Sequence, residues 1–191
     1  MMLDVDKLLN IQYVHSNIPG ITDAIAQYLH ESCEICLKFH GHLPGVFLFL
    51  DGNLAPSHSL PLIWKQSLPV NAPQAHADLQ DSTEDGAVAL ALLLVTNYTD
   101  YAVVSRAPKG EGFDYFLLPK NQLHANGNET NFLSFSYPYH LEVSGILRES
   151  RNNSRIQRLQ EKRQRFQKFG TKGTNLVIIV AFDTPAATME S

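Results

Sequence analysis

The pattern of apolar and polar residues in the second half of this chain predicts a helix, three strands, a second helix and a final strand. The first helix, residues 82–97, is almost wholly apolar after an acidic first turn, as is typical of a buried helix. The second helix, 154–169, is rich in arginine, lysine and glutamine. The strands are short runs with many β-branched, aromatic and leucine residues at 100–107, 113–119, 139–147 and 175–182. This order predicts an α/β fold in which a mixed sheet carries one helix on each face.

The first part of the chain predicts one more helix and a pair of strands. The helix runs from about residue 22 to residue 39, with Thr22 or Asp23 as its cap, and it stops where glycine and proline occur in HGHLPG. The other segments are strands at 46–52 and 60–66, a proline-rich connection with at most a short helical turn at 67–81, and a tail at 183–191.

Length and composition indicate one globular domain. The chain has 191 residues, of which 44% are hydrophobic and 18% charged, so it can bury a sizeable core. We expect a single domain over 1–191, with 1–81 as an N-terminal extension and 82–185 as the core. The longest apolar run, Ala87 to Val95, has nine residues, about half of a membrane helix. The N-terminal residues lack the pattern of a secretory signal, which predicts a cytoplasmic protein without membrane contact.

Two carboxylates stand inside the predicted strands. Asp114 lies in GFDYFLL and Glu142 in HLEVSG, and both are flanked by residues that favour burial. Burying an ionised carboxylate is costly unless a metal, a cation or hydrogen bonds compensate it. Two such acids on neighbouring strands suit Mg²⁺ or Mn²⁺, which bind oxygen ligands. The alternative is structural: Asp114 would bond backbone amides or pair with Arg106, and Glu142 would pair with an arginine of the basic helix.

Positive charge is concentrated near the second helix. From Arg148 to Lys172 the chain has nine basic residues and two acids, a net charge of +7, so the rest carries −11 of the total of −4. Such asymmetry is typical of an element that binds a polyanion on an otherwise acidic body, although a solvated helix face is the alternative. The predicted nucleic-acid contacts are Arg155, Arg158, Lys162, Arg163 and Arg165.

Two cysteines and two histidines lie close together in the sequence. Cys33 and Cys36 form a C-x-x-C, followed by His40 and His42. Four ligands within ten residues lack the separated pairs of most structural zinc motifs. Both cysteines fall at or near the buried face of an amphipathic helix, which favours plain core cysteines over a zinc or redox role.

The order of elements and the two acids together resemble the core of the PD-(D/E)XK nuclease superfamily, the restriction-endonuclease-like αβββαβ fold. The matching residues are Glu84 at the start of the first helix, Asp114 in GFD, and Glu142 in EVS, where the family has E-x-K. The resemblance covers about residues 82–185. This stretch also looks like uncharacterised bacterial proteins of this type. On the basic helix, Lys162, Gln164 and Gln167 stand where some exonuclease-like members carry a further polar motif.

The resemblance implies a nuclease that depends on Mg²⁺ or Mn²⁺. Asp114 and Glu142 would be metal ligands, the backbone carbonyl of Val143 a further ligand, and Glu84 a ligand directly or through water. The metal would activate water for attack on a phosphodiester and stabilise the charge that develops on the phosphate.

The sequence departs from the family at one position. Ser144 replaces the lysine of E-x-K, and a hydroxyl has no positive charge to place on the phosphate. A lysine from elsewhere in the fold would have to take that role. Lys162 on the basic helix is the first candidate and Lys109 the second.

Three functions remain open. The first is a metal-dependent nuclease that acts on DNA through the basic helix. The second, suggested by Ser144, is a catalytically inactive subunit or adaptor of a larger complex in bacterial defence or DNA processing, with the apolar run 46–50 as one place for a protein partner. The third is a module that binds zinc or a small molecule through the Cys and His cluster. Two histidines near the acids, His124 and His140, are in a loop and at a strand start, where single histidines are usually not ligands. Tyr115, Tyr137 and Tyr139 could stack on bases, but aromatic residues in strands mostly belong to the core.

Overall fold

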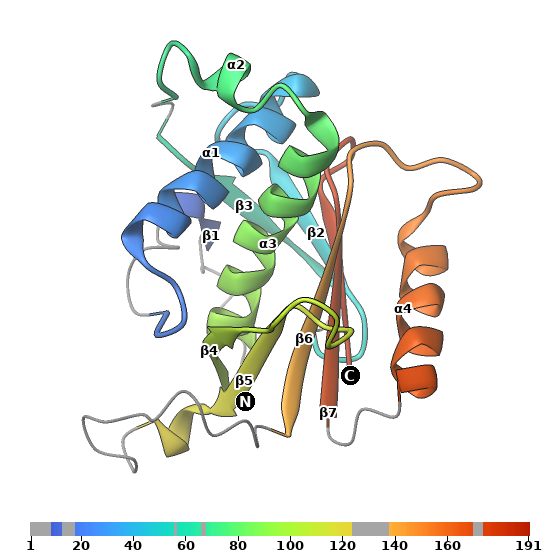
Figure 1. Cartoon of the computed structure of the whole chain (residues 1–191). Coiled ribbons are helices and arrows are strands. Elements are labelled where there is room, and N and C mark those ends of the chain that lie inside the picture. Colours follow the sequence, from blue (N-terminus) through green and yellow to red (C-terminus); the bar gives the residue numbers. More distant parts are fainter. Residues whose placement is uncertain (1–8, 13–17, 56, 66–67, 124–137, 170–173) are drawn as a thin grey trace.

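One eight-stranded mixed sheet runs through the protein, as a computed structural model of the chain shows (Figure 1). The structure describes residues 9–12, 18–55, 57–65, 68–123, 138–169 and 174–191. The strand order is β1-β3-β2-β8-β7-β6-β5-β4. The strands are β1 Leu9–Asn10, β2 Phe47–Asp51, β3 His58–Ile63, β4 Tyr101–Arg106, β5 Tyr115–Pro119, β6 Tyr139–Ile146, β7 Thr174–Ala181 and β8 Ala186–Glu190. The helices are α1 Asp23–Phe39, α2 Ala72–Ala75, α3 Leu79–Tyr98 and α4 Arg155–Phe169, with a 3₁₀ turn at Lys120–Gln122.

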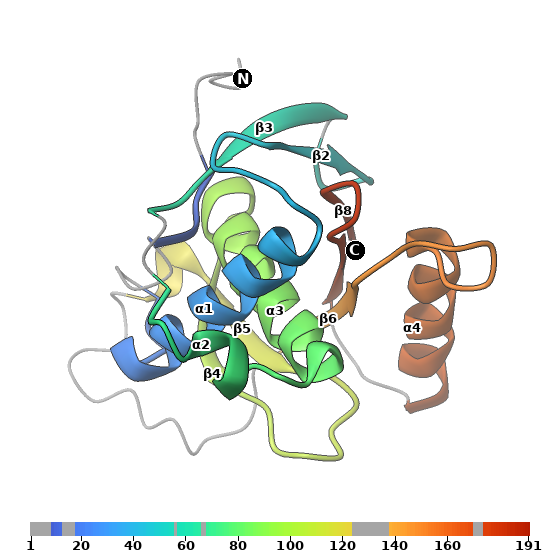
Figure 2. The ribbon, with the colours of Figure 1, turned by 90° about the horizontal axis from the view of Figure 1, so that it is seen from above.

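The predicted α/β class and the predicted element order from α3 to β7 are confirmed. β4, β5 and β6 pair antiparallel, and α4 then carries the chain to β7, which pairs parallel to β6. Figure 2 shows α1 and α3 on one side of the sheet and α4 on the other. Each side has its own apolar cluster, the larger under α1 and α3 and the smaller, with Leu159 and Phe166, under α4. Both faces of the central strands are therefore buried.

The apolar helix begins earlier than the sequence pattern suggests. Its first residue is Leu79 and its cap is Asp78, whose carboxylate accepts a hydrogen bond from the Gln80 amide at 2.8 Å. The predicted start at residue 82 is therefore wrong, because an aspartate four residues upstream already satisfies the first free amides. As a consequence Glu84 lies in the second turn of α3, not at the helix start.

Two glycines allow α3 to approach its neighbours closely. A Cβ on Gly86 would lie 2.9 Å from the Cα of Cys33 in α1, and one on Gly145 would lie 2.2 Å from the carbonyl oxygen of Thr83. No side chain fits at Gly145 unless α3 moves away from β6. The close contact fixes the distance between the start of α3 and the strand that carries Glu142.

The C-terminal segment predicted to be a tail is a strand. β8 pairs antiparallel with β7 and parallel with β2, so it joins the antiparallel β2-β3 pair to the rest of the sheet. The tail prediction is wrong because AATME has no clear alternation, and its place depends on partners far away in the sequence. No helix among the described residues is long and apolar enough to cross a membrane.

Candidate functional site

The two acids of the predicted strands meet where β5 begins. Tyr115, the first residue of β5, lies opposite Leu141, and from Glu142 onward β6 continues with β7 as its paired neighbour. Asp114 stands just before β5, and its Oδ2 accepts a hydrogen bond from the Val143 amide at 2.8 Å. The antiparallel register thus places Asp114 beside Glu142, at the edge of β6 that β5 no longer covers.

Glu142 is almost fully buried, and cations of α4 compensate its charge. Its side chain is 4% exposed, and its Oε1 forms an ion pair with the Nζ of Lys162. The guanidinium of Arg165 lies 3.6 Å from the same oxygen. Burial, followed by the nearby charge of Asp114, raises the pKa of Glu142 above the ordinary value of 4.5, while Lys162 and Arg165 act in the opposite direction. The site therefore holds a carboxylate whose ionisation depends on its cationic neighbours.

A cleft of about 600 Å³ surrounds the acid pair. α3, the segment after β4, β6 and α4 all contribute to its walls, so residues far apart in the sequence converge there. Its charged and polar lining consists of Glu84, Asp85, Asp114, Glu142, Ser144, Arg106, Lys109, Arg158, Lys162 and Arg165. All the residues predicted from the resemblance as catalytic or metal-binding, Val143 included, line this one cleft. We call it the acid cleft.

The oxygens available in the acid cleft are of the kind that Mg²⁺ and Mn²⁺ bind. Among the described residues, the polar contacts of the acid pair use Oδ2 of Asp114 and Oε1 of Glu142, which leaves one oxygen of each carboxylate for a further ligand. Mg²⁺ is often held by only one or two carboxylates together with substrate phosphate oxygens. In the described part of the chain no three acidic, histidine or cysteine side chains are grouped closely enough to hold a metal. Asp114 and Glu142 are the acids that could hold such a metal together with substrate oxygens, and Glu84 lines the same cleft.

The basic side chains of α4 fall into two sets. Arg158, Lys162 and Arg165 line the acid cleft. Arg155 is held elsewhere: its guanidinium donates to Asp51 and to Thr188, both at 3.0 Å. Further along the helix, the Arg163 guanidinium is ion-paired with Glu190 at the end of β8. Of the five predicted nucleic-acid contacts, three therefore face the acid cleft, while Arg155 and Arg163 attach α4 to β2 and β8.

Asp85 and Arg106 are two charged residues of the cleft whose proximity the sequence does not show. The structural alternative for Asp114 predicts an ion pair with Arg106; among the described residues these two line the same cleft without an ion pair. Asp85 follows Glu84 on α3 and faces the cleft one turn before Val88. The only sequence signal for Asp85 is that it is one of several acids near the start of the helix, which gives no information on what lies opposite.

The two cysteines and two histidines that lie close in the sequence do not form a common site in the structure. Cys33 and Cys36 are buried in α1, whereas His40 and His42 bond the carbonyl oxygens of Leu147 at 2.6 Å and Phe182 at 2.9 Å. Burial raises the pKa of Cys33 well above its ordinary value and that of Cys36 to about 11. Both are therefore protonated core thiols.

The other aromatic and histidine candidates are mostly packed. His140 stacks on Phe113 at 4.1 Å between ring centroids, and Tyr139 packs against Tyr101 at 4.8 Å. Tyr115 is 4% exposed, and burial raises its pKa to about 12. His124, Tyr137, Lys172 and the side chains of Gln167 and Lys168 lie outside the described residues.

Comparisons of the chain with protein-family models, with curated proteins and with solved structures give no match.

Proposed function

We propose that the protein is a metal-dependent nuclease that hydrolyses phosphodiester bonds, with DNA as the first substrate to test. The observation that carries the proposal is the meeting of Asp114, Glu142 and Lys162 from three separate elements in one cleft. A protein has little structural reason to place two carboxylates side by side at a buried strand edge, because each makes the other harder to ionise.

The arrangement of elements supports the same proposal. α3, the antiparallel strands β4 to β6, the crossing helix α4 and the parallel strand β7 follow the order of the restriction-endonuclease-like core. On this assignment the two acids would correspond to the metal ligands of that core, one at the second strand and one within the third. The proposed fold assignment therefore rests on both topology and site position.

The residues of the acid cleft have distinct parts in this proposal. Asp114 and Glu142 would hold Mg²⁺ or Mn²⁺ with their remaining oxygens, and the metal supplies Lewis acidity for hydrolysis when bound. Lys162 offers an ammonium group with three donors and, once released from Glu142, it is in reach of a phosphate bound at the acid pair. Arg158 and Arg165 add positive charge for the backbone of the substrate.

One observation favours a second candidate, a catalytically inactive subunit or adaptor with the same fold. The Lys162 ammonium already neutralises Glu142 without any metal, and Ser144 cannot replace the missing lysine. In addition, β2 exposes 62% of Phe47 and 41% of Phe49, apolar surface that a protein partner would cover. In this case the acid pair has only a structural role.

Metal binding separates the two candidates. The experiment is a calorimetric titration of Mn²⁺ into the wild type and into Asp114→Asn, Glu142→Gln and the control Glu161→Gln, which removes an exposed acid of α4 outside the acid cleft. A nuclease gives saturable binding in the wild type and the control that both cleft variants lose. If the wild type and the three variants are all folded and none binds Mn²⁺, alone or with an oligonucleotide present, the result favours the adaptor.

Cleavage tests the lysine. Labelled single- and double-stranded DNA and RNA are incubated with the protein and Mg²⁺ or Mn²⁺, and Lys162→Ala is compared with Lys109→Ala. Loss of cleavage in the Lys162 variant alone supports Lys162 as the residue that replaces the family lysine. If Lys162→Ala cleaves at the wild-type rate and Lys109→Ala does not cleave, Lys109 is the residue that replaces the family lysine.

A further inference from the structure

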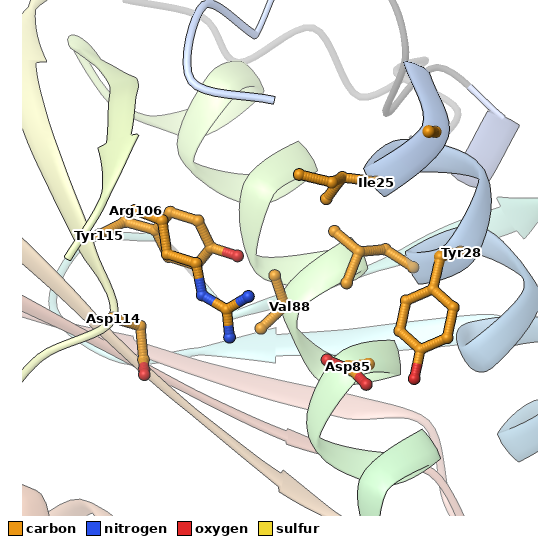
Figure 3. A pocket seen from close by; sticks show the side chains of 9 residues that line it. Ile25, Tyr28, Asp85, Val88, Arg106, Asp114 and Tyr115 are labelled. Carbon is orange, nitrogen blue, oxygen red and sulfur yellow. The ribbon is translucent and has the colours of Figure 1, made fainter. Parts of the chain in front are cut away.

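A second, smaller pocket opens beside the acid cleft. It has a volume of about 260 Å³ and lies between α1, α3 and the strands β4 and β5. Figure 3 shows Ile25 and Tyr28 reaching into it from α1, Val88 and Asp85 from α3, and Arg106 from β4. We call it the side pocket.

The side pocket and the acid cleft are adjacent. Four residues line both of them: Asp85, Val88, Arg106 and Asp114. Asp114 is also one of the two acids of the proposed metal site. A phosphodiester placed at the acid pair would therefore have its neighbouring nucleoside at the entrance of the side pocket.

The walls of the side pocket combine an apolar surface with a polar edge. Ile25, in the first turn of α1, is 40% exposed, and Tyr28, in the second turn, is 46% exposed, so both present apolar surface to the side pocket. The Tyr28 ring is supported by His76, on which it stacks at 5.1 Å between centroids. Burial and a hydrogen bond with Asp85 raise the pKa of Tyr28, so the phenol stays neutral.

The polar edge offers both an acceptor and donors. The carboxylate of Asp85 accepts hydrogen bonds, and the guanidinium of Arg106 donates them. In Figure 3 the Arg106 guanidinium points from β4 toward Val88 and Asp85 on α3. A planar heterocycle with donor and acceptor groups on its edge matches this combination, since its faces can contact Tyr28 and Ile25 while its edge reaches Asp85 and Arg106.

We propose that the side pocket binds an unpaired nucleobase of the strand whose phosphate lies in the acid cleft, which makes single-stranded nucleic acid the substrate class. This inference rests on the proposed nuclease function. Pockets for small molecules usually measure about 300–1,000 Å³, so the side pocket has room for little more than one base. A base can enter it only after leaving the helical stack, a step that costs least in a single strand.

The experiment measures binding in EDTA, which prevents metal-dependent hydrolysis. Fluorescence anisotropy of labelled oligonucleotides gives the affinity for a single strand and for the same sequence as a duplex. The variants are Tyr28→Ala, which removes the ring, and Tyr28→Phe, which keeps the ring and removes the hydroxyl. Phe47→Ala is the control, because it removes an exposed aromatic ring from β2, outside the side pocket and the acid cleft.

The expected result is a wild type that binds the single strand more tightly than the duplex. Tyr28→Ala weakens single-strand binding about tenfold, the order of effect of losing one base–aromatic stack, whereas Tyr28→Phe and Phe47→Ala bind like the wild type. A 2-aminopurine in the strand changes its fluorescence with the wild type and much less with Tyr28→Ala.

Two outcomes overturn the inference and are distinguishable. If Tyr28→Ala binds single strands as tightly as the wild type, the side pocket does not bind a base, while loss of cleavage in Asp114→Asn would leave the nuclease proposal standing. If the wild type binds neither single strands nor duplexes, the nucleic-acid function itself is wrong, and the base pocket with it.

Discussion

Replacing Lys162 by methionine tests how the protein keeps a buried carboxylate ionised. Methionine retains an unbranched apolar side chain and removes the ammonium group that pairs with Glu142. The Glu142 side chain, 4% exposed, is then left with Arg165, whose own side chain is 52% exposed and screened by water. Removing one partner of a buried ion pair costs roughly 3–5 kcal/mol. Because Lys162 is itself 16% exposed and Arg165 remains, we expect a loss of about 2–3 kcal/mol at neutral pH.

The loss should depend on pH in a defined direction. Burial and Asp114 raise the pKa of Glu142 in the folded protein above 4.5, and removing Lys162 raises it further because one opposing cation disappears. An acid with a raised pKa in the folded state destabilises that state as the pH rises from the ordinary value through the raised one. The cost of Lys162→Met is therefore small at acidic pH, where Glu142 is protonated, and full at neutral pH.

The assay is equilibrium unfolding in urea, with EDTA present, over a series from acidic to neutral pH. Trp64, the single tryptophan of the chain, is 3% exposed and reports unfolding through its fluorescence. Lys109→Met, in the exposed segment after β4, is the control, with an expected change within about 0.5 kcal/mol. The double variant Lys162→Met with Glu142→Gln should regain most of the lost stability, since no buried charge is left.

Two results would refute this reasoning. One is a loss of stability in Lys162→Met that stays constant across the pH series. The other is a Glu142→Gln variant that is as destabilised at neutral pH as Lys162→Met. A raised pKa means that the fold disfavours the ionised form of Glu142, so replacing this residue by a neutral one should cost less.

Three further predictions concern the fold around the site. Gly145→Ala should lower the free energy of unfolding by about 3 kcal/mol, measured by thermal melting, because its Cβ would meet the Thr83 carbonyl; unchanged stability would show that α3 can move freely. Asp78→Ala should cost about 1 kcal/mol by loss of the α3 cap, with Asp78→Asn close to wild type in the same urea assay. Cys33 and Cys36 should react with a thiol reagent only after unfolding, and rapid reaction of the native protein would contradict their burial.

The sequence by itself determined the order of the elements from α3 to β7 and the strand that carries Glu142; Asp114, predicted inside a strand, lies one residue before β5. Local hydrophobic patterning was sufficient for this, because a strand or helix of ordinary length shows its buried face within its own residues. The same patterning put Asp114 and Glu142 among residues that favour burial. It also put Lys162 on the helix that follows these strands, whereas the contact of Lys162 with Glu142 is a finding of the structure.

The positions that sequence reasoning missed depend on contacts between distant segments. β8 is a strand because β7 and β2 flank it, and its own residues do not show this. The charge of the basic helix was visible in the sequence, but which arginines face the cleft was not. That division depends on Asp51, Thr188 and Glu190, which pairing of the strands brings to α4.

The side pocket is the clearest case of a feature that only the tertiary structure decided. Tyr28, Asp85 and Arg106 come from three elements, and each has an ordinary explanation in its own segment: a helix-surface aromatic, a helix acid and a strand-end cation. Side-chain periodicity reports which face of an element is buried, and it contains no information on which face of another element lies opposite. The packing of α1 on α3 and of α3 beside β4 and β5 brings the three together, and so creates a pocket next to Asp114.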